Sequence, residues 1–546
     1  METFGIWGLI PPLLTVVLAL MTKDVIISLF MGILSGTLLI AGGNPFIALT
    51  GLSDLLANSL NDGWNLRIFL FTALMGVLVG ILSKTGSAYA FGHWASKRIK
   101  TKRGALLLSW FFGIFIFIDD YFNSLTIGTV MKPLTDEKKV SRAKLAYVLD
   151  STAAPVVIMA PISTWVVYVM SVIKESDGFS SLGISEMGYF IRVIPFNFYA
   201  IFAVIMVGFI TITKKDFGPM LHSEHRAEKG LGLFDEEKYG AVSGQVEEKF
   251  EEKFLDGAKP YDMLVPIFLL IIICFAMFPI NTWMGRGYGD VSAYSGFFDA
   301  MAHMSIGEAF NDSDASTAMM DATIITLLIT YVYFMLRRRL TIKTAGEAIV
   351  EGFKSMVPAL MILVMAWALG SLIKSSPADG GLGLTTYLSN VIVNGGFPLA
   401  LLPVVVFVIA CILSFSTGTS WGTFAIMIPL TMPIAVGLGE AAGMSGAALM
   451  SATLVPIGAI LGGAIFGDHS SPISDTTVLS STGAGVPHLE HVATQVPYAV
   501  FVAISALFGH LTSGITHSAL AGLLVTAIIF VTGLYLLSRF WGDKEE

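Results

Sequence analysis

Several aspartates lie inside strongly apolar stretches of the sequence, each beside residues that carry hydroxyl groups. Asp468 opens the run DHSSPISDTT, Asp150 opens DSTAAP, and Asp119 and Asp120 lie in FIDDYFNSLT. An ionisable side chain in the apolar part of a membrane costs roughly 2.5–3.5 kcal/mol on insertion scales, so a functional role is the first hypothesis. Carboxylate and hydroxyl oxygens are hard ligands that suit a cation such as Na⁺. We therefore predict a cation site, with Asp468 as the first ligand and Asp150 as the second.

Two of these aspartates are followed closely by a proline, Pro155 after Asp150 and Pro472 after Asp468. Proline lacks a backbone donor and clashes with the preceding turn, so each helix should break there. A break leaves backbone carbonyls and amides without hydrogen-bond partners. Such groups occur inside a membrane only where protein or a water-filled cavity surrounds them. Each aspartate could also cap the amides at its break. Capping and ion binding are compatible roles.

Further candidate ligands surround the four aspartates. Beside the breaks lie Ser151, Thr152, His469, Ser470, Ser471, Asp475 and Thr476, and in the two polar-tipped stretches lie Asn123, Ser124, Ser416, Thr417, Thr419 and Ser420. We expect Na⁺ at Asp468, Asp150, Asn123 and Thr419, and we expect one of Asp119 and Asp120 to face the site while the other anchors the tip. A hydroxyl that bonds its own helix carbonyl is the plain alternative. His469 could carry protons or serve as a hydrogen-bonded structural group.

A histidine pair occurs near the C-terminal end, in the sequence HLEH formed by His488 and His491. Its spacing suits a metal, but no further ligands lie nearby in the sequence. We predict that this pair lies in a solvated cytoplasmic loop. A metal-dependent hydrolase built on Asp468, His469 and Asp475 is disfavoured for a similar reason, because a single histidine ligates zinc poorly. The sequence therefore predicts neither an enzyme nor a catalytic cofactor.

Composition places the chain in a membrane. Of its 546 residues 54% are hydrophobic and 13% are charged, whereas soluble domains carry about 25% charged residues. Apolar runs predict about 11 transmembrane helices, the first of them at the N-terminus, in an all-α polytopic protein. The sequence contains no basic patch with interleaved aromatic residues, so nucleic-acid binding is not predicted. The two cysteines both lie in apolar runs and do not indicate a disulfide framework. The predicted spans are 5–21, 25–42, 66–84, 145–173, 190–213, 263–283, 318–336, 354–374, 447–480, 497–512 and 518–538.

Two further apolar stretches, 104–135 and 397–434, are interrupted by polar residues and are predicted to be re-entrant hairpins. Basic residues flank both ends of the first stretch, which places both ends in the cytoplasm. Between Lys374 and Arg539 there is no Lys or Arg, which places both ends of the second stretch outside. The resulting topology has the N-terminus and residues 375–396 outside, and the charged segment 214–262 and the C-terminus in the cytoplasm.

The two interrupted stretches belong to an internal repeat. MKPLT at 131–135 matches MIPLT at 427–431, and each motif is followed by a helix that breaks at an acid, hydroxyls and a proline. With the topology above, the halves run in opposite directions, which is typical of secondary transporters. We expect transport-core segments at 104–175 and 397–482, scaffold helices at 1–103, 176–213 and 263–396, a cytoplasmic loop at 214–262, and C-terminal helices at 483–546.

The stretches GDHSSPISDTT, FIDDYFNSLT and LDSTAAPV resemble those of the NhaC family of Na⁺/H⁺ antiporters, within the wider ion transporter superfamily. The resemblance covers the chain from about residue 60 onward. It implies two re-entrant hairpins and two broken helices, a transport domain that moves against a scaffold like an elevator, and commonly a homodimer in the cell membrane. Members of the superfamily include proton antiporters, a malate/lactate exchanger and carriers of amino or organic acids.

Two functions are therefore compared. The first is Na⁺/H⁺ antiport, in which one carboxylate binds either ion, because a carboxylate in a low-dielectric site holds a proton tightly enough for protons to compete. The second is Na⁺-coupled carriage or exchange of a small amino acid or organic acid, with half-helix amino ends receiving its carboxylate. The motif cores carry no Arg or Lys to balance a multiply charged anion, apart from Lys132 at the end of the first. The first function is favoured, with Na⁺, H⁺ and the lipid bilayer as partners.

Overall fold

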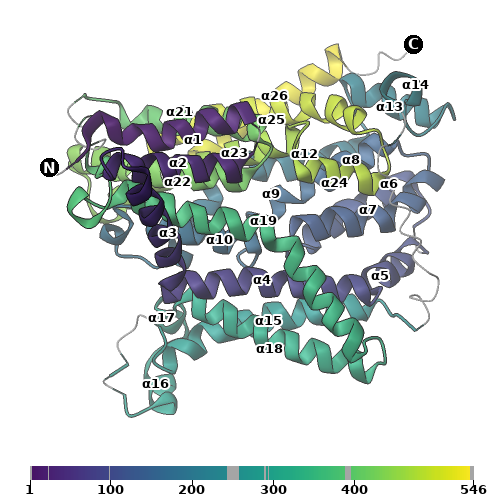
Figure 1. Ribbon diagram of the computed structural model, residues 1–546. Coiled ribbons are helices and arrows are strands. Elements are labelled where there is room, and N and C mark those ends of the chain that lie inside the picture. Colours follow the sequence, from purple (N-terminus) through teal and green to yellow (C-terminus); the bar gives the residue numbers. More distant parts are fainter. Residues whose placement is uncertain are drawn as a thin grey trace.

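The protein is described by a computed structural model that covers residues 3–22, 24–97, 99–240, 242, 257–287, 291–292, 294–387, 391 and 395–541. Regular structure within these ranges is helical, and no strand occurs in them (Figure 1). The helices up to residue 239 are α1 (Ile10–Thr22), α2 (Val25–Ile40), α3 (Pro45–Asn61), α4 (Gly63–Lys84), α5 (Ser87–Ser96), α6 (Lys102–Phe115), α7 (Asp120–Glu137), α8 (Arg142–Thr152), α9 (Ala154–Val157), α10 (Thr164–Glu175), α11 (Glu186–Val193), α12 (Phe198–Thr213), α13 (Gly218–Glu228) and α14 (Glu236–Tyr239). The later helices are α15 (Tyr261–Trp283), α16 (Phe297–His303), α17 (Ile306–Asn311), α18 (Ala315–Leu336), α19 (Ile342–Lys374), α21 (Leu402–Thr417), α22 (Ser420–Ala441), α23 (Gly446–Ser470), α24 (Asp475–Ala484), α25 (His488–Thr516) and α26 (Ala519–Phe540).

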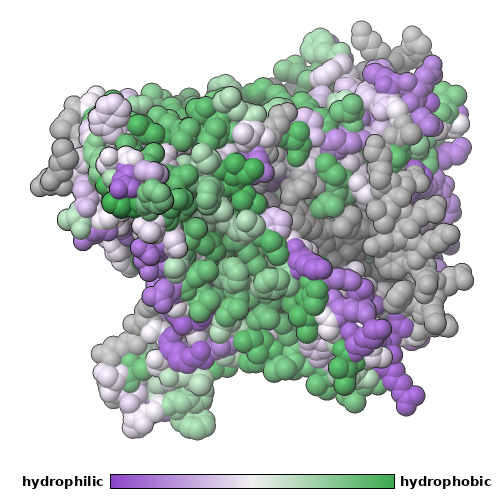
Figure 2. All heavy atoms as spheres, viewed as in Figure 1, coloured by the Kyte–Doolittle hydropathy of each residue, from purple (hydrophilic) through white to green (hydrophobic). Residues whose placement is uncertain are grey.

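The protein is a multi-pass membrane protein. Ten helices among the described residues are long and apolar enough to cross a bilayer, and two shorter apolar helices lie near the N-terminus. Most long helices run in the same general direction (Figure 1), and hydrophobic side chains cover the middle of the visible face while hydrophilic ones gather toward the helix ends (Figure 2). This distribution is expected when the middle of the molecule contacts lipid and its two ends contact water. The number of crossings stays a prediction.

The two ends of the molecule carry different parts of the chain. At one end the amide of Phe4 donates to the carbonyl of Leu382 at 3.0 Å, and at the other the amide of Gly218 donates to the carbonyl of Trp541 at 3.2 Å. The N-terminal segment therefore shares an end with residues near 382, and the start of the charged segment shares the opposite end with the C-terminal helix. Residues 542–546, predicted to be cytoplasmic, lie outside the described ranges.

Both predicted hairpin stretches form a pair of helices with a short break between them. Residues 116–119 separate α6 from α7, and Gly418 and Thr419 separate α21 from α22. Gly418 has φ +70°, the left-handed conformation that ends helices and that glycine adopts without penalty. A Cβ at this glycine would lie 2.8 Å from the carbonyl oxygen of Ile473, so the break between α21 and α22 contacts the residues that follow α23.

The helices that carry Asp150 and Asp468 are also interrupted. α8 ends at Thr152, Ala153 leaves the helical conformation (φ −81°, ψ −91°), and Pro155 lies in the first turn of the short α9. α23 ends at Ser470, and residues 471–474, which include Pro472, separate it from α24. Both aspartates therefore lie in the last turn of a helix, where backbone carbonyls lose their partners.

Helix α24, which follows the second interruption, packs directly on α7 and α8. A Cβ built on Gly128 of α7 would lie 2.7 Å from the backbone of Gly483 of α24. Only glycine at these positions lets the two backbones approach so closely. The segment after the second break is therefore held against the first hairpin and the first broken helix.

A second close crossing joins α4 to α19. A Cβ on Gly352 of α19 would lie 2.2 Å from the carbonyl oxygen of Gly76 in α4, and a Cβ on Gly80 would lie 2.5 Å from the carbonyl oxygen of Ala348. Backbone atoms cannot move aside as a flexible side chain can. The crossing therefore depends on glycine.

We expect Gly352→Ala to lower the stability of the purified protein by about 1–3 kcal/mol, the usual cost of overpacking. The matched control is Gly346→Ala in the same helix, where a Cβ meets nothing within 4 Å and should stabilise by about 0.5–1 kcal/mol. Thermal unfolding of both variants in one detergent measures the difference. Equal melting temperatures would contradict the prediction, because they would show that α4 and α19 move apart to admit the Cβ without a loss of stability.

Candidate functional site

Asp468 lies at the centre of a group of oxygen atoms from three separate segments. Its side chain is buried, with 1% exposed. Asp468 Oδ2 accepts from the amide of Ser420 at 3.0 Å and from its hydroxyl at 2.7 Å. Asp468 Oδ1 accepts from the hydroxyls of Ser474 at 2.6 Å and of Thr476 at 3.5 Å. We call Asp468, Ser420, Ser474 and Thr476 the Asp468 cluster.

The Asp468 cluster joins the start of α22, the end of α23 and the start of α24. A hydroxyl group is both donor and acceptor and can rotate, so each of the three hydroxyls that now points at the carboxylate can instead present a lone pair to a cation beside it. One carboxylate and three hydroxyl oxygens form a hard-oxygen ligand set. These ligand atoms therefore suit a monovalent cation. Ser474 was not among the ligands predicted from the sequence, although it lies between Pro472 and two further hydroxyl-bearing residues.

Other candidates near the second break bond the backbone. The hydroxyl of Ser471 donates to the carbonyl of Phe415 at 2.6 Å, that of Thr417 to Leu413 at 2.8 Å, and that of Ser470 to Phe466. For these three residues the alternative role, a hydroxyl that satisfies a helix carbonyl, is the one seen. The Ser471 contact also attaches the break to the end of α21.

Three candidates of the second half stand apart from these bonds. Ser416 is half-buried, and Thr419 is half-buried at the start of α22, where its carbonyl accepts from the hydroxyl of Thr423 at 3.1 Å. The side chain of Asp475 lies outside the described part of the structure. The predicted role of Thr419 as a Na⁺ ligand therefore stays a prediction.

Asp150 belongs to a different hydrogen-bonded group. Asp150 Oδ2 accepts from His491 Nε2 at 3.0 Å and from Gln495 Nε2 at 2.8 Å, both on α25. Gln495 also donates to the backbone carbonyl of His469, whose ring bonds the hydroxyl of Tyr199. All five side chains are buried. We call these residues the Asp150 cluster, which connects the first broken helix to the second through α25.

The prediction that His491 lies in a solvated loop is wrong. α25 begins at His488, so His491 is one turn inside a helix and fully buried. His488 bonds the carbonyl of Pro472 at 2.7 Å and the hydroxyl of Ser481 at 3.2 Å. Among the described residues no group of three His, Cys, Asp or Glu is arranged to hold a metal. His491 is thus a functional candidate that sequence reasoning missed, because its partner Asp150 lies 341 positions away.

The first tip is held mainly by Asn123. Asn123 Nδ2 donates to the carbonyls of Gly113 and Ile116, both at 2.8 Å, and of Thr152 at 3.4 Å. It thereby satisfies carbonyls at the ends of both α6 and α8. Asn123 Oδ1 and Asp150 Oδ1 are buried acceptors with no hydrogen-bond partner among the described residues. Each such oxygen can accept a cation or a proton donor.

The remaining candidates of the first half take separate positions. Asp120 Oδ1 accepts from the indole of Trp165 at 3.0 Å, the carbonyl of Asp119 accepts from the amide of Asn123 at 3.0 Å, and both aspartates are buried. Ser124 accepts from the hydroxyl of Ser480 in α24 at 3.2 Å. Ser151 is buried, and Thr152 donates to the carbonyl of Val148 at 2.6 Å.

Aromatic side chains connect the two tips. Trp165, which holds Asp120, packs edge-on against Trp421 with ring centroids 5.8 Å apart. Tyr168 donates to the carbonyl of Trp421 at 2.8 Å. α10 therefore contacts both the first tip and the start of α22. The structure brings Asp468, Ser420 and Thr476 together, and it places Asp150 and Asn123 in two other groups.

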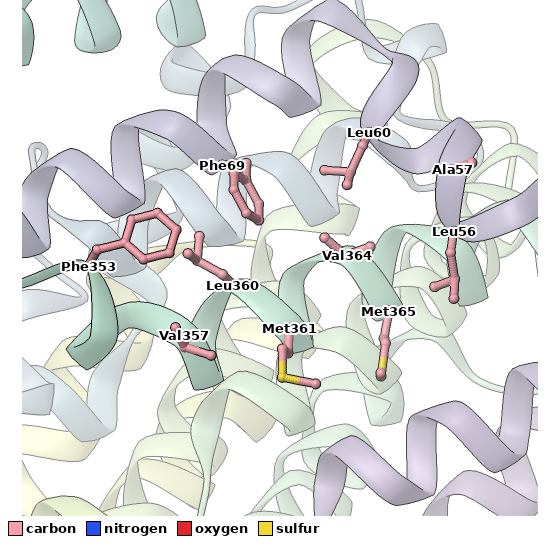
Figure 3. Close-up of a pocket in the computed structure, with 10 residues that line it drawn as sticks. All are labelled: Leu56, Ala57, Leu60, Phe69, Phe353, Val357, Leu360, Met361, Val364 and Met365. Atoms are coloured by element: carbon pink, nitrogen blue, oxygen red, sulfur yellow. The ribbon is translucent and has the colours of Figure 1, made fainter. Parts of the chain in front are cut away.

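An apolar groove lies away from these clusters. It has a volume of about 450 Å³ and lies between α3, α4 and α19, where Leu60, Phe69, Leu360 and Met361 are among its lining residues (Figure 3). All ten lining residues are apolar, so the groove offers no side-chain ligand for an ion.

One family model and several proteins are similar to this chain. The model of the Na⁺/H⁺ antiporter family matches residues 156–515. The chain is 35% identical over 542 residues to an uncharacterized protein of Haemophilus influenzae. That alignment covers 98% of this chain and 96% of the relative. It is 34% identical over 147 residues to an uncharacterized Na⁺/H⁺ antiporter of the same organism, 27% of this chain and 28% of that one.

Two further similarities concern a named exchanger and a solved structure. The chain is 37% identical over 154 residues to the malate-2H⁺/Na⁺-lactate antiporter of Bacillus subtilis, 28% of each chain. The structure of the Alcanivorax borkumensis YdaH transporter aligns over 92% of this chain and 88% of that one, with 12% identity and a TM-score of 0.46.

Proposed function

Because the chain belongs to the Na⁺/H⁺ antiporter family, we propose that it exchanges cytoplasmic Na⁺ for external H⁺ through membrane-embedded carboxylates. The observation that carries the proposal is the Asp468 cluster, a buried carboxylate near the end of α23 with three hydroxyls from the starts of α22 and α24. A buried charge of this kind needs compensation, and a bound cation or proton supplies it. We place the Na⁺ at this cluster.

The exchange follows from competition at the carboxylate. In a low-dielectric site the neutral acid is favoured, so a proton binds tightly, while Na⁺ favours the ionised form and displaces it. If only the loaded forms reorient, Na⁺ moves in one direction and protons in the other. Asp150, whose Oδ1 is buried without a partner among the described residues, is the second proton-carrying carboxylate of the proposal.

The membrane arrangement is part of the proposal. We propose that α6–α7 and α21–α22 are re-entrant hairpins of an inverted repeat, and that the two interrupted helices form a core which moves against the other helices. The breaks at Ala153 and at residues 471–474 support this arrangement, because interrupted helices let backbone and side chains face a transported ion. The expected setting is a homodimer in the cell membrane with the C-terminus in the cytoplasm.

A second function is the exchange or Na⁺-coupled carriage of a small organic acid. It is favoured by the partial similarity to a malate/lactate antiporter. Two basic residues, Lys132 and Arg142, lie beside the end of α24: Arg142 donates to the carbonyl of Gly485 at 2.9 Å, and a Cβ on that glycine would lie 2.6 Å from Lys132 Nζ. Neither residue belongs to the Asp468 cluster.

Purified protein in liposomes with a trapped pH dye and an acidic interior separates the two functions. Added Na⁺ should dissipate the gradient by driving protons out, while K⁺ at equal concentration and protein-free liposomes give the baseline. If Na⁺ alone has no effect, the antiport proposal fails. Labelled malate, lactate and amino acids, each tested with a Na⁺ gradient, then test the second function.

A further inference from the structure

A buried group of charges at the C-terminal end of the molecule has no role in the exchange described above. Lys144 Nζ lies 2.5 Å from Asp216 Oδ2 and 3.7 Å from Glu224 Oε2, and Lys102 Nζ lies 2.8 Å from the same Glu224 oxygen. Lys144, Asp216 and Glu224 are buried, although Asp216 and Glu224 belong to the segment 214–262 that was predicted to be a cytoplasmic loop. These four residues line a cavity of about 100 Å³ together with Lys214 and Glu228. The cavity is charged and lies between α6, α8 and α13.

The charged segment is attached at this place to α8, which carries Asp150, and to α25, which carries His491 and Gln495. The amide of Ser141, at the start of α8, donates to Glu224 at 2.8 Å. Glu490, in the first turn of α25, accepts from the hydroxyl of Ser223 at 2.9 Å and from the amide of Asp235 at 2.8 Å. The segment thus covers the N-terminal ends of α8 and α25, the two helices whose side chains meet at Asp150.

Two buried tyrosines, Tyr498 and Tyr147, lie between this cavity and the helix turn that carries Asp150. Asp216 Oδ1 accepts from the hydroxyl of Tyr498 on α25 at 2.9 Å. Tyr498 is fully buried and packs against Tyr147 of α8, with ring centroids 5.0 Å apart. Tyr147 is three positions before Asp150, a spacing at which helix neighbours have Cβ atoms about 5–6 Å apart.

We propose that Tyr147, Tyr498 and Asp216 form the route by which protons pass between Asp150 and water in the charged cavity. The inference rests on the proposed Na⁺/H⁺ exchange and adds its path for the proton. A phenol hydroxyl both donates and accepts, so a proton that reaches Tyr147 releases the proton of that hydroxyl to Tyr498. Tyr498 in turn releases its own proton to Asp216. Both phenols end with one proton each, and one proton in total has moved.

The charges around Asp216 fit a transient proton acceptor. Lys144 of α8 faces it directly, Glu224 of α13 shares that lysine, Lys102 of α6 pairs with Glu224, and Tyr498 of α25 donates to it. When Asp216 takes up a proton, Lys144 keeps Glu224 as a partner. When it releases the proton to the cavity, the pair with Lys144 forms again. Asp216 therefore exchanges a proton without leaving an uncompensated buried lysine.

Tyr498→Phe and Tyr147→Phe test the route, because each removes one hydroxyl and keeps the aromatic ring. Two rates are measured in liposomes: proton movement driven by Na⁺, and exchange of labelled Na⁺ for unlabelled Na⁺ at equal pH, which needs no net proton movement. We expect each variant to slow the Na⁺/H⁺ exchange roughly 10- to 100-fold, within the range of a positioned proton-transfer group. The Na⁺/Na⁺ exchange should stay within about twofold of the unmodified protein.

Tyr189→Phe is the matched control, because it removes another buried tyrosine hydroxyl on α11, away from the route. It should change neither rate. If Tyr498→Phe and Tyr147→Phe slow both exchanges equally, the tyrosines serve packing or motion of the core, and the route is overturned. It is also overturned if both rates are unchanged. A failure of the proposed function looks different, because the unmodified protein would then show no Na⁺/H⁺ exchange at all.

Discussion

Replacing Asp468 by Asn is expected to reduce Na⁺-driven proton movement by about 30-fold or more. Loss of one partner from a buried charge pair costs about 2–5 kcal/mol, and each 1.4 kcal/mol is a factor of about ten. The amide is nearly the same size, but it carries no charge, and its NH₂ group faces hydroxyls that now donate to the carboxylate. The pH-dye assay in liposomes measures the rate, and binding of labelled Na⁺ to purified protein measures the affinity.

The control for this variant is Asp54→Asn, the same chemical change at an exposed position of α3. It should leave both measurements unchanged. A second comparison resolves the ligand set. Ser474→Ala removes a hydroxyl from Asp468 and should weaken Na⁺ binding roughly 2- to 10-fold, since a hydrogen-bonding group contributes about 0.5–1.5 kcal/mol. Thr417→Ala removes a hydroxyl that serves the carbonyl of Leu413 and should not. Exchange by Asp468→Asn at more than a third of the normal rate contradicts the site.

Lys144→Met is expected to lower the stability of the protein by about 3–5 kcal/mol, the usual cost of removing one partner of a buried ion pair. Methionine fills similar space without charge, and Asp216 and Glu224 are left buried without their shared lysine. Thermal unfolding in detergent measures the loss. The control is Lys343→Met, at an exposed position of α19, which should change stability by less than about 0.5 kcal/mol.

Adding Asp216→Asn to Lys144→Met should restore part of the lost stability, because Glu224 still pairs with Lys102 and the carboxylate left without Lys144, that of Asp216, is then neutral. This rescue separates the loss of charge compensation from a simple packing defect, which the second substitution would not repair. A Lys144→Met protein as stable as the Lys343→Met control would show that the carboxylates find other compensation.

Local signals in the sequence predicted most of what depends on nearby residues. Proline beside aspartate indicated where the chain interrupts its helices, and α8 and α23 end within two residues of Asp150 and Asp468. Composition predicted an all-helical membrane protein. α3 was not predicted, because Asp54 and Asn58 interrupt its apolar run, although Asn44 before Pro45 is a helix-start signal that the structure uses: Asn44 accepts from the amide of Phe46 at 3.0 Å.

The candidate site was predictable only in part, because its bonds join distant segments. Ser420 could be expected near Asp468 from the repeat, but nothing in the sequence around Asp150 indicates His491 or Gln495 on α25. HLEH is charged and polar, which favoured a solvated loop, and only the packing of α25 against α8 shows that His491 is inside. The burial of Asp216 and Glu224 could not be predicted for the same reason, because their partner Lys144 lies in α8, far away in the sequence.

The contact of Gly128 with Gly483 has a consequence for how this protein can evolve. The two glycines belong to the two halves that we propose to be an inverted repeat, and neither position has space for a side chain while the other backbone lies so close. A lineage that gains a side chain at one position must move the other helix in the same step. At this contact the two halves can therefore change only together.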